Sequence, residues 1–190
     1  MRFANVLVIA SLTALLVSCS GTRSYVNPDA DMAYYRRVGV AAFESLAEDS
    51  RAGQKLQRIF LTELLKKGKF DLVPQGQFDK VELEVRNKQG LAFPAALDSA
   101  ALAAIAQQTG AQGIIIGTVR DYRMERVGQE EFPMVAFSLK LIDAPTGRVV
   151  WDVSVGERGG PKLPVISLGE THTLSELATK LCRRALGTLP

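Results

Sequence analysis

The side chains in this sequence best suited to nucleophilic or metal chemistry are two cysteines, Cys19 and Cys182, and a single histidine, His172. One histidine cannot build a multi-histidine metal site, and a Ser-His-Asp triad would require it as the base. Cys182 lies between Leu181 and Ala185 in an apolar helical pattern, which is typical of a small buried side chain. The glycines match neither a phosphate-binding loop nor a dinucleotide fingerprint. We therefore expect no catalytic residue, no metal site, no cofactor and no enzymatic activity.

Cys19 differs from Cys182 in its sequence context. It closes the run Leu16-Val17-Ser18-Cys19 behind a short apolar segment, residues 6–17, which itself follows Arg2. An apolar segment of this length is too short to span a bilayer, because a hydrocarbon core of about 30 Å needs about 20 helical residues. A charged start, an apolar segment and a small residue before the cleavage point indicate a secretory signal peptide. The alternative is an ordinary signal peptide in which the cysteine is incidental.

This run resembles the bacterial lipobox at all four positions. The resemblance implies cleavage after Ser18 and lipidation of Cys19 on its sulfur and its amine. Residue 20 is a serine rather than an aspartate, which in the lipoproteins that the chain resembles implies sorting to the outer membrane. We therefore expect Cys19 to anchor the protein in the inner leaflet of the outer membrane, on the periplasmic face.

Composition sets the limits of the remaining chain. The sequence carries 23 Lys and Arg against 20 Asp and Glu, which is too even a balance to indicate a nucleic-acid partner. With Cys19 lipidated, only Cys182 remains, so no intramolecular disulfide can form. We expect three parts: a signal peptide over residues 1–18, the lipidated cysteine with a short tether over 19–35, and a single α/β domain over 36–190.

The expected tether is polar and lacks any regular hydrophobic period. Sixteen residues, from 20 to 35, reach at most about 55 Å when fully extended. At its end lies a cluster of aromatic and basic residues, Tyr34, Tyr35, Arg36 and Arg37. This cluster is a candidate for contact with lipid head groups or a neighbouring subunit, and the alternative is a plain strand edge.

Apolar periodicity and turn signals predict the elements of the domain. The segment 75–97 is open, because it allows either a short helix or an irregular strand. We expect an α/β (α+β sandwich) fold, with a mixed sheet of about five strands and helices packed on it. The expected elements, in chain order, are a strand over 37–43, a helix from Asp49 or Ser50 to Gly68, a strand over 70–73, an Ala-rich helix from Asp98 to Gly110, a strand over 113–119, a hairpin of strands 135–141 and 149–155 with its turn at 143–147, and a final helix opened by Thr173.

Trp151 is the one tryptophan of the chain. It alternates with Val149, Val153 and Val155, which predicts the inward face of a strand. Aromatic residues are also frequent anchors of protein interfaces. Trp151 is therefore either a core residue or a partner contact.

Four pieces of the sequence together resemble the periplasmic α/β domain shared by curli-secretion, Pel polysaccharide-export and penicillin-binding-protein-activator lipoproteins (CsgG, PelC and LpoB). The strand-turn-strand that ends in Trp151 is the most specific of them. This resemblance implies a domain that acts by assembly and contact without turnover. The pieces are residues 38–43, residues 61–65, residues 102–117 and residues 139–151.

Within this group, the synthase activator crosses the cell wall on a long disordered arm, whereas the tether expected here is short. We therefore expect a non-enzymatic, lipid-anchored periplasmic component of an envelope export or assembly system. It is most like a polysaccharide-export accessory lipoprotein that oligomerises under the outer membrane. Its expected partners are the membrane, through the lipid, and further copies of the chain or another envelope protein. The alternative is an activator of a peptidoglycan synthase, a penicillin-binding protein.

Overall fold

The computed structural model describes residues 21–92, 96–160 and 171–190. They form one mixed sheet whose strands follow the order β1-β7-β6-β5-β2-β4, with β3 paired to β5. The predicted fold class is confirmed, and the sheet has seven strands where about five were expected. The strands are β1 (Thr22–Val26), β2 (Arg37–Val40), β3 (Glu44–Ser45), β4 (Asp71–Leu72), β5 (Gly113–Val127), β6 (Glu130–Asp143) and β7 (Val149–Arg158).

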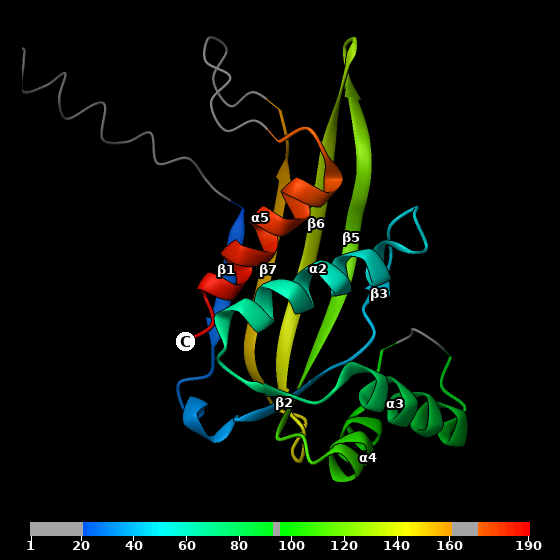
Figure 1. The fold of residues 1–190 in the computed structure, drawn as a ribbon, viewed down its shortest axis with the longest axis vertical. Coiled ribbons are helices and arrows are strands. Elements are labelled where there is room, and N and C mark those ends of the chain that lie inside the picture. Colours follow the sequence, from blue (N-terminus) through cyan, green and yellow to red (C-terminus); the bar gives the residue numbers. More distant parts are fainter. Residues whose placement is uncertain (1–20, 93–95, 161–170) are drawn as a thin grey trace, which may run out of the picture.

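Helices cover the sheet unequally (Figure 1). The helices α2 and α5 lie side by side over one face, where Phe60 and Leu181 pack in the same cluster as Phe137 of the sheet. The helices α3 and α4 lie together at one end of the sheet, in a second cluster built around Phe78 and Ile105. The helical segments are η1 (Met32–Tyr34), α2 (Ala52–Lys67), α3 (Gln75–Gln89), α4 (Ser99–Thr109) and α5 (Leu174–Gly187).

Most predicted helix ends are confirmed. The helix α2 ends at Gly68, which has the left-handed φ of 62° that favours glycine. The side chain of Asp98 accepts the N–H of Ala101 at 2.7 Å, and that of Thr173 accepts the N–H of Glu176 at 3.2 Å.

The start of α2 differs from the prediction. Its N-cap is Arg51, and no side chain caps the helix. The carboxylate of Asp49 accepts the N–H of Arg51 at 2.9 Å, so it organises the turn one step before the helix. Capping by Asp49 or Ser50 was therefore wrong, although the position of the helix was right.

The segment that the sequence left open forms α3. Its buried side is mixed, because Glu82 and Arg86 share it with Phe78 and Val85, and this breaks the apolar period. Phe78 lies against β2, where a Cβ on Gly39 would approach its Cε2 to 2.1 Å. Helix α3 can therefore dock on the sheet only because residue 39 has no side chain.

The expected tether is wrong over residues 22–35. Residues Thr22 to Val26 form β1, an edge strand that pairs antiparallel with β7 from Thr22↔Val155 to Val26↔Trp151. The strand escaped prediction because most of its side chains are exposed and polar, so it has no apolar alternation. Only residues 20 and 21 separate Cys19 from β1.

Strands β5 and β6 are longer than predicted. They continue as a two-stranded arm past the other strands at the top of Figure 1, here called the β5–β6 arm (residues 124–133). Its ladder closes at Val127↔Glu130, and Gly128 takes a φ of 68° in the turn. The charged residues of the arm hid this extension. Within the described ranges, none of the helices has the length and apolar character that a membrane span requires.

Candidate functional site

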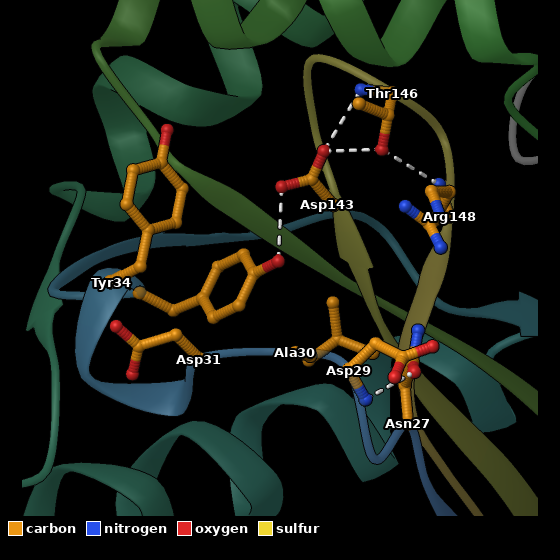
Figure 2. Close-up of a pocket in the computed structure, with 10 residues that line it drawn as sticks. Asn27, Asp29, Ala30, Asp31, Tyr34, Asp143, Thr146 and Arg148 are labelled. Carbon is orange, nitrogen blue, oxygen red and sulfur yellow. Dashed lines mark hydrogen bonds between the residues drawn. The ribbon is translucent and has the colours of Figure 1, made fainter.

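A pocket of about 180 Å³ lies where the segment after β1 meets the β6–β7 turn (Figure 2). Asp29, Asp31 and Tyr34 line one side, and Asp143, Thr146 and Arg148 line the other. The remaining lining residues are Asn27, Ala30, Tyr35 and Val150.

Tyr35 forms the link between the two sides. Its side chain is buried, and its hydroxyl donates a hydrogen bond to Asp143 Oδ2 at 3.0 Å. Its ring meets that of Tyr34 edge to face, with centroids 5.2 Å apart and planes at 84°. Burial, followed by the bond to Asp143, raises the pKa of Tyr35 to about 12. The phenol therefore stays protonated at neutral pH and cannot act as a base.

Asp143 closes the β6–β7 turn from inside. Its Oδ1 accepts the N–H of Thr146 at 2.9 Å and also the Thr146 hydroxyl. Gly147 takes a φ of 71° and donates its N–H to the Asp143 carbonyl at 2.8 Å. The turn at 143–147 was predicted, but the partnership of Asp143 with Tyr35 was not.

The charges of the pocket are unequal. Asp29, Asp31 and Asp143 contribute three carboxylates, and Arg148 contributes one guanidinium. Asp31 is partly committed to the fold, because its Oδ1 accepts the N–H of Ala33 at 2.9 Å. Carboxylates, a phenol and an aromatic ring can hold a small polar group through hydrogen bonds and charge. The pocket is thus suited to binding.

The predicted aromatic and basic cluster divides in the structure. Arg37 is used in the fold, since Nη1 contacts Asp71 Oδ2 at 2.8 Å and Nε donates to the Thr109 carbonyl at 3.2 Å. Tyr35 is buried in the pocket wall. Tyr34, which is 47% exposed, and Arg36 remain at the surface. These two residues retain the surface needed for an external contact.

Trp151 lies in the core and is fully buried. Its Nε1 donates to Thr188 Oγ1 at 3.0 Å, which fixes the end of α5 against β7. Of the two alternatives that the sequence left open, the structure therefore places Trp151 in the core and not at the surface. The indole has no exposed surface in this chain for a partner.

The other residues considered for chemistry lie apart from the pocket. Cys19 falls outside the described residues. Cys182 is fully buried in α5, and burial raises the pKa of its thiol, which makes it a poor nucleophile at neutral pH. His172 is exposed and lies two residues before α5 begins. Across the described ranges, no three His, Cys, Asp or Glu side chains are grouped to hold a metal ion.

A second hollow, of about 550 Å³, lies between α2 and α3. Beneath it, Glu82 and Arg86 form a buried ion pair, with Arg86 Nη2 at 2.7 Å from Glu82 Oε1. Glu82 Oε2 also accepts the N–H of Ala42 at 3.0 Å. Burial raises the pKa of Glu82, while Ala42 and Arg86 oppose the shift. The pair joins α3 to the end of β2 and was not foreseen.

A protein-family model described as the peptidoglycan-synthase activator LpoB matches residues 53–155. This match covers more than half of the chain. No curated protein matches the chain.

Several solved structures share the fold. A PelC dodecamer from Paraburkholderia phytofirmans is similar over 87% of this chain and 94% of its own, with 21% identity and a TM-score of 0.59. The lipoprotein GNA1162 from Neisseria meningitidis is similar over 80% of this chain and 99% of its own, with 17% identity and a TM-score of 0.55. At these identities the likeness shows the fold.

Proposed function

The chain belongs to the LpoB family of peptidoglycan-synthase activators, and from this membership we propose that it is a non-catalytic lipoprotein of the cell envelope. It acts by binding other proteins. The raised pKa values of Tyr35 and Cys182 support this, since both side chains hold their protons at neutral pH. The pocket at Tyr35 is then a contact site and not an active site.

Cys19 is the proposed anchor, lipidated after removal of residues 1–18 and held in the inner leaflet of the outer membrane. Two lipid chains suffice for stable attachment. Because β1 starts at Thr22, the connection from Cys19 has three residue steps and reaches at most about 10 to 11 Å. The folded domain then lies directly against the periplasmic face of the membrane.

This short connection is the observation that carries the finer proposal, an accessory role in polysaccharide export. A domain held so close to the outer membrane can contact a channel or further copies at that membrane. The related PelC structures are dodecamers, which supports assembly of this chain into a ring. Tyr34 and Arg36 offer exposed side chains for such contacts.

Activation of a peptidoglycan synthase is the second candidate, and the family match supports it. It requires the domain to meet an enzyme across the cell wall. A connection of about 10 to 11 Å gives no such reach by itself.

Two measurements test the proposal. Fractionation of cells should find the wild type and the Cys182→Ala variant in the membrane and the Cys19→Ala variant in the soluble fraction. Mass spectrometry of the first mature peptide should find acyl chains on Cys19. An unmodified Cys19 in the membrane fraction would overturn the anchor.

Native mass spectrometry of the lipidated protein in detergent tests assembly. The proposed role in polysaccharide export predicts a multimer. A protein that stays monomeric at high concentration contradicts that role. Titration with a purified penicillin-binding protein from the same cells tests the second candidate, which fails if no binding occurs at micromolar concentrations.

A further inference from the structure

The β5–β6 arm and the proposed anchor point to the same end of the molecule. The ladder places Thr22 level with Val155, which pairs with Phe137. From Phe137, β6 extends toward the arm tip at Glu130, a distance of about 23 Å at about 3.3 Å per residue. The tip therefore extends well past the start of β1 (Figure 1).

This distance exceeds the reach of the anchor. The connection from Cys19 to Thr22 spans about 10 to 11 Å, and a head-group layer is about 5 to 7 Å thick on each side of the hydrocarbon core. If the arm stood along the membrane normal, its tip would enter the hydrocarbon. The arm must lean by more than about 45° from the normal to stay out of it.

The side chains of the tip suit the boundary between water and lipid. Met124 and Val127 are apolar and are 40% and 42% exposed. Arg126, Glu130 and Glu131 are exposed and charged, and such residues are costly in hydrocarbon but not among hydrated head groups. Met124 and Val127 are three residues apart on β5, so they lie on opposite faces of the ribbon, and Val127 is the one beside the turn at Gly128. The tip therefore presents one apolar side chain on each face, beside charges that keep it shallow.

Resting on the anchor of the proposed function, we propose that the tip of the β5–β6 arm (residues 124–131) lies in the phospholipid head-group layer beside the lipidated Cys19. The domain then has two attachments to one membrane, the acyl chains and the arm. Val127, beside the turn, enters the layer, and the four charged side chains of the tip, Glu125, Arg126, Glu130 and Glu131, stay hydrated at its surface. The two attachments fix the tilt of the domain, which a single lipid anchor alone does not.

Fluorescence on the full-length lipidated protein tests this. The Val127→Cys variant carries an environment-sensitive dye, and the matched Leu83→Cys variant carries it on α3, where Leu83 is 52% exposed. Cys182 is fully buried and Cys19 is acylated, so each variant takes one dye. Both proteins are reconstituted into vesicles of phosphatidylethanolamine and phosphatidylglycerol, and lipid-borne and water-soluble quenchers are compared.

The proposal predicts a blue-shifted dye at residue 127, several-fold stronger quenching from the lipid and several-fold weaker quenching from water than at residue 83. Equal, water-like quenching at both positions on vesicle-bound protein overturns the arm contact and leaves the anchor standing. A protein that carries no lipid and leaves the vesicles contradicts the anchor, and the arm contact with it.

Discussion

The guanidinium of Arg183 on α5 contacts the carboxylate of Glu63 on α2, with Nε at 2.8 Å from Oε2. Lys66 binds the other oxygen of Glu63 at 2.7 Å. The pair connects the two helices that cover one face of the sheet. Arg183 lies largely in solvent while Glu63 is buried at the helix interface, so the carboxylate depends on its two cations.

Glu63 is predicted to make the free energy of unfolding depend on pH in the acid range. The hydrogen bond from Arg183, and then that from Lys66, lowers the pKa of Glu63 from 4.5 to about 2. A carboxyl with a lowered pKa in the folded state stabilises it above about pH 4.5, and this contribution is lost as the pH falls toward 2. Glu63→Gln should lower the free energy of unfolding by about 1 kcal/mol at pH 7 and by much less at pH 2.

Urea unfolding at both pH values measures this difference, with Glu48→Gln as the matched control because Glu48 is exposed. An equal loss for Glu63→Gln at both pH values contradicts the ion-pair explanation.

Tyr35→Phe is predicted to destabilise the pocket wall while the aromatic ring keeps its packing. The substitution removes the hydroxyl that donates to Asp143 and keeps the ring, so the free energy of unfolding should fall by about 1 kcal/mol. Tyr34→Phe is the control, because its hydroxyl has no hydrogen bond to any residue that the structure describes and its side chain is 47% exposed. Thermal unfolding compares the two. A larger loss of stability for Tyr34→Phe than for Tyr35→Phe would contradict the hydrogen bond between Tyr35 and Asp143.

Gly39→Ala is predicted to separate α3 from the sheet. The new methyl group would lie 2.1 Å from Phe78 Cε2, so either Phe78 or the strand must move, at a cost of about 1 to 3 kcal/mol. Gly76→Ala is the matched control in α3, where a Cβ meets nothing within 4 Å and should be neutral or slightly stabilising. Chemical denaturation ranks the two variants, and a harmless Gly39→Ala would refute the docking of Phe78 on β2.

The buried pair Glu82 and Arg86 is predicted to be strongly coupled. Arg86→Met leaves the Glu82 carboxylate buried without its main counter-charge and should cost about 3 to 5 kcal/mol. The double variant with Glu82→Gln should lose less than the two single variants combined, because neither charge is then stranded. A double-mutant cycle by urea unfolding gives the coupling. Additive losses would mean that the two side chains act independently.

The parts of the fold that the sequence predicts well have strong local signals. Helix α4 has Asp98 at its start and Gly110 at its end, and the β6–β7 hairpin has clean alternation and a Pro-Thr-Gly turn. The strand β1 has none of these, since an edge strand with exposed side chains needs no apolar pattern, and its partner β7 lies far along the chain. The strand β1 is identified only by its pairing with β7 in the structure.

The candidate site was harder to predict than the fold. Tyr35 and Tyr34 were singled out, but the partner of Tyr35 is Asp143, which is 108 residues away and reads locally as a turn residue. Helix α3 was left open because Glu82 and Arg86 occupy positions where apolar residues are expected. The partner of Tyr35 is distant along the chain, so a local pattern does not contain it. Glu82 and Arg86 are four residues apart, but their burial depends on distant contacts such as the N–H of Ala42 on Glu82, which a local pattern does not contain either.

The pairing of β1 with β7 also determines how the domain carries mechanical load. A pull on the amino-terminal end of β1 acts along the strand axis, perpendicular to the hydrogen bonds with β7. It therefore loads the ladder from Thr22↔Val155 to Val26↔Trp151 in shear. Shear strains these pairs together, whereas a pull across the strand would break them one after another. The last pair contains Trp151, which is fixed in the core and bound to Thr188. Tension that enters at residue 22 is therefore carried through the ladder into the packed centre of the domain.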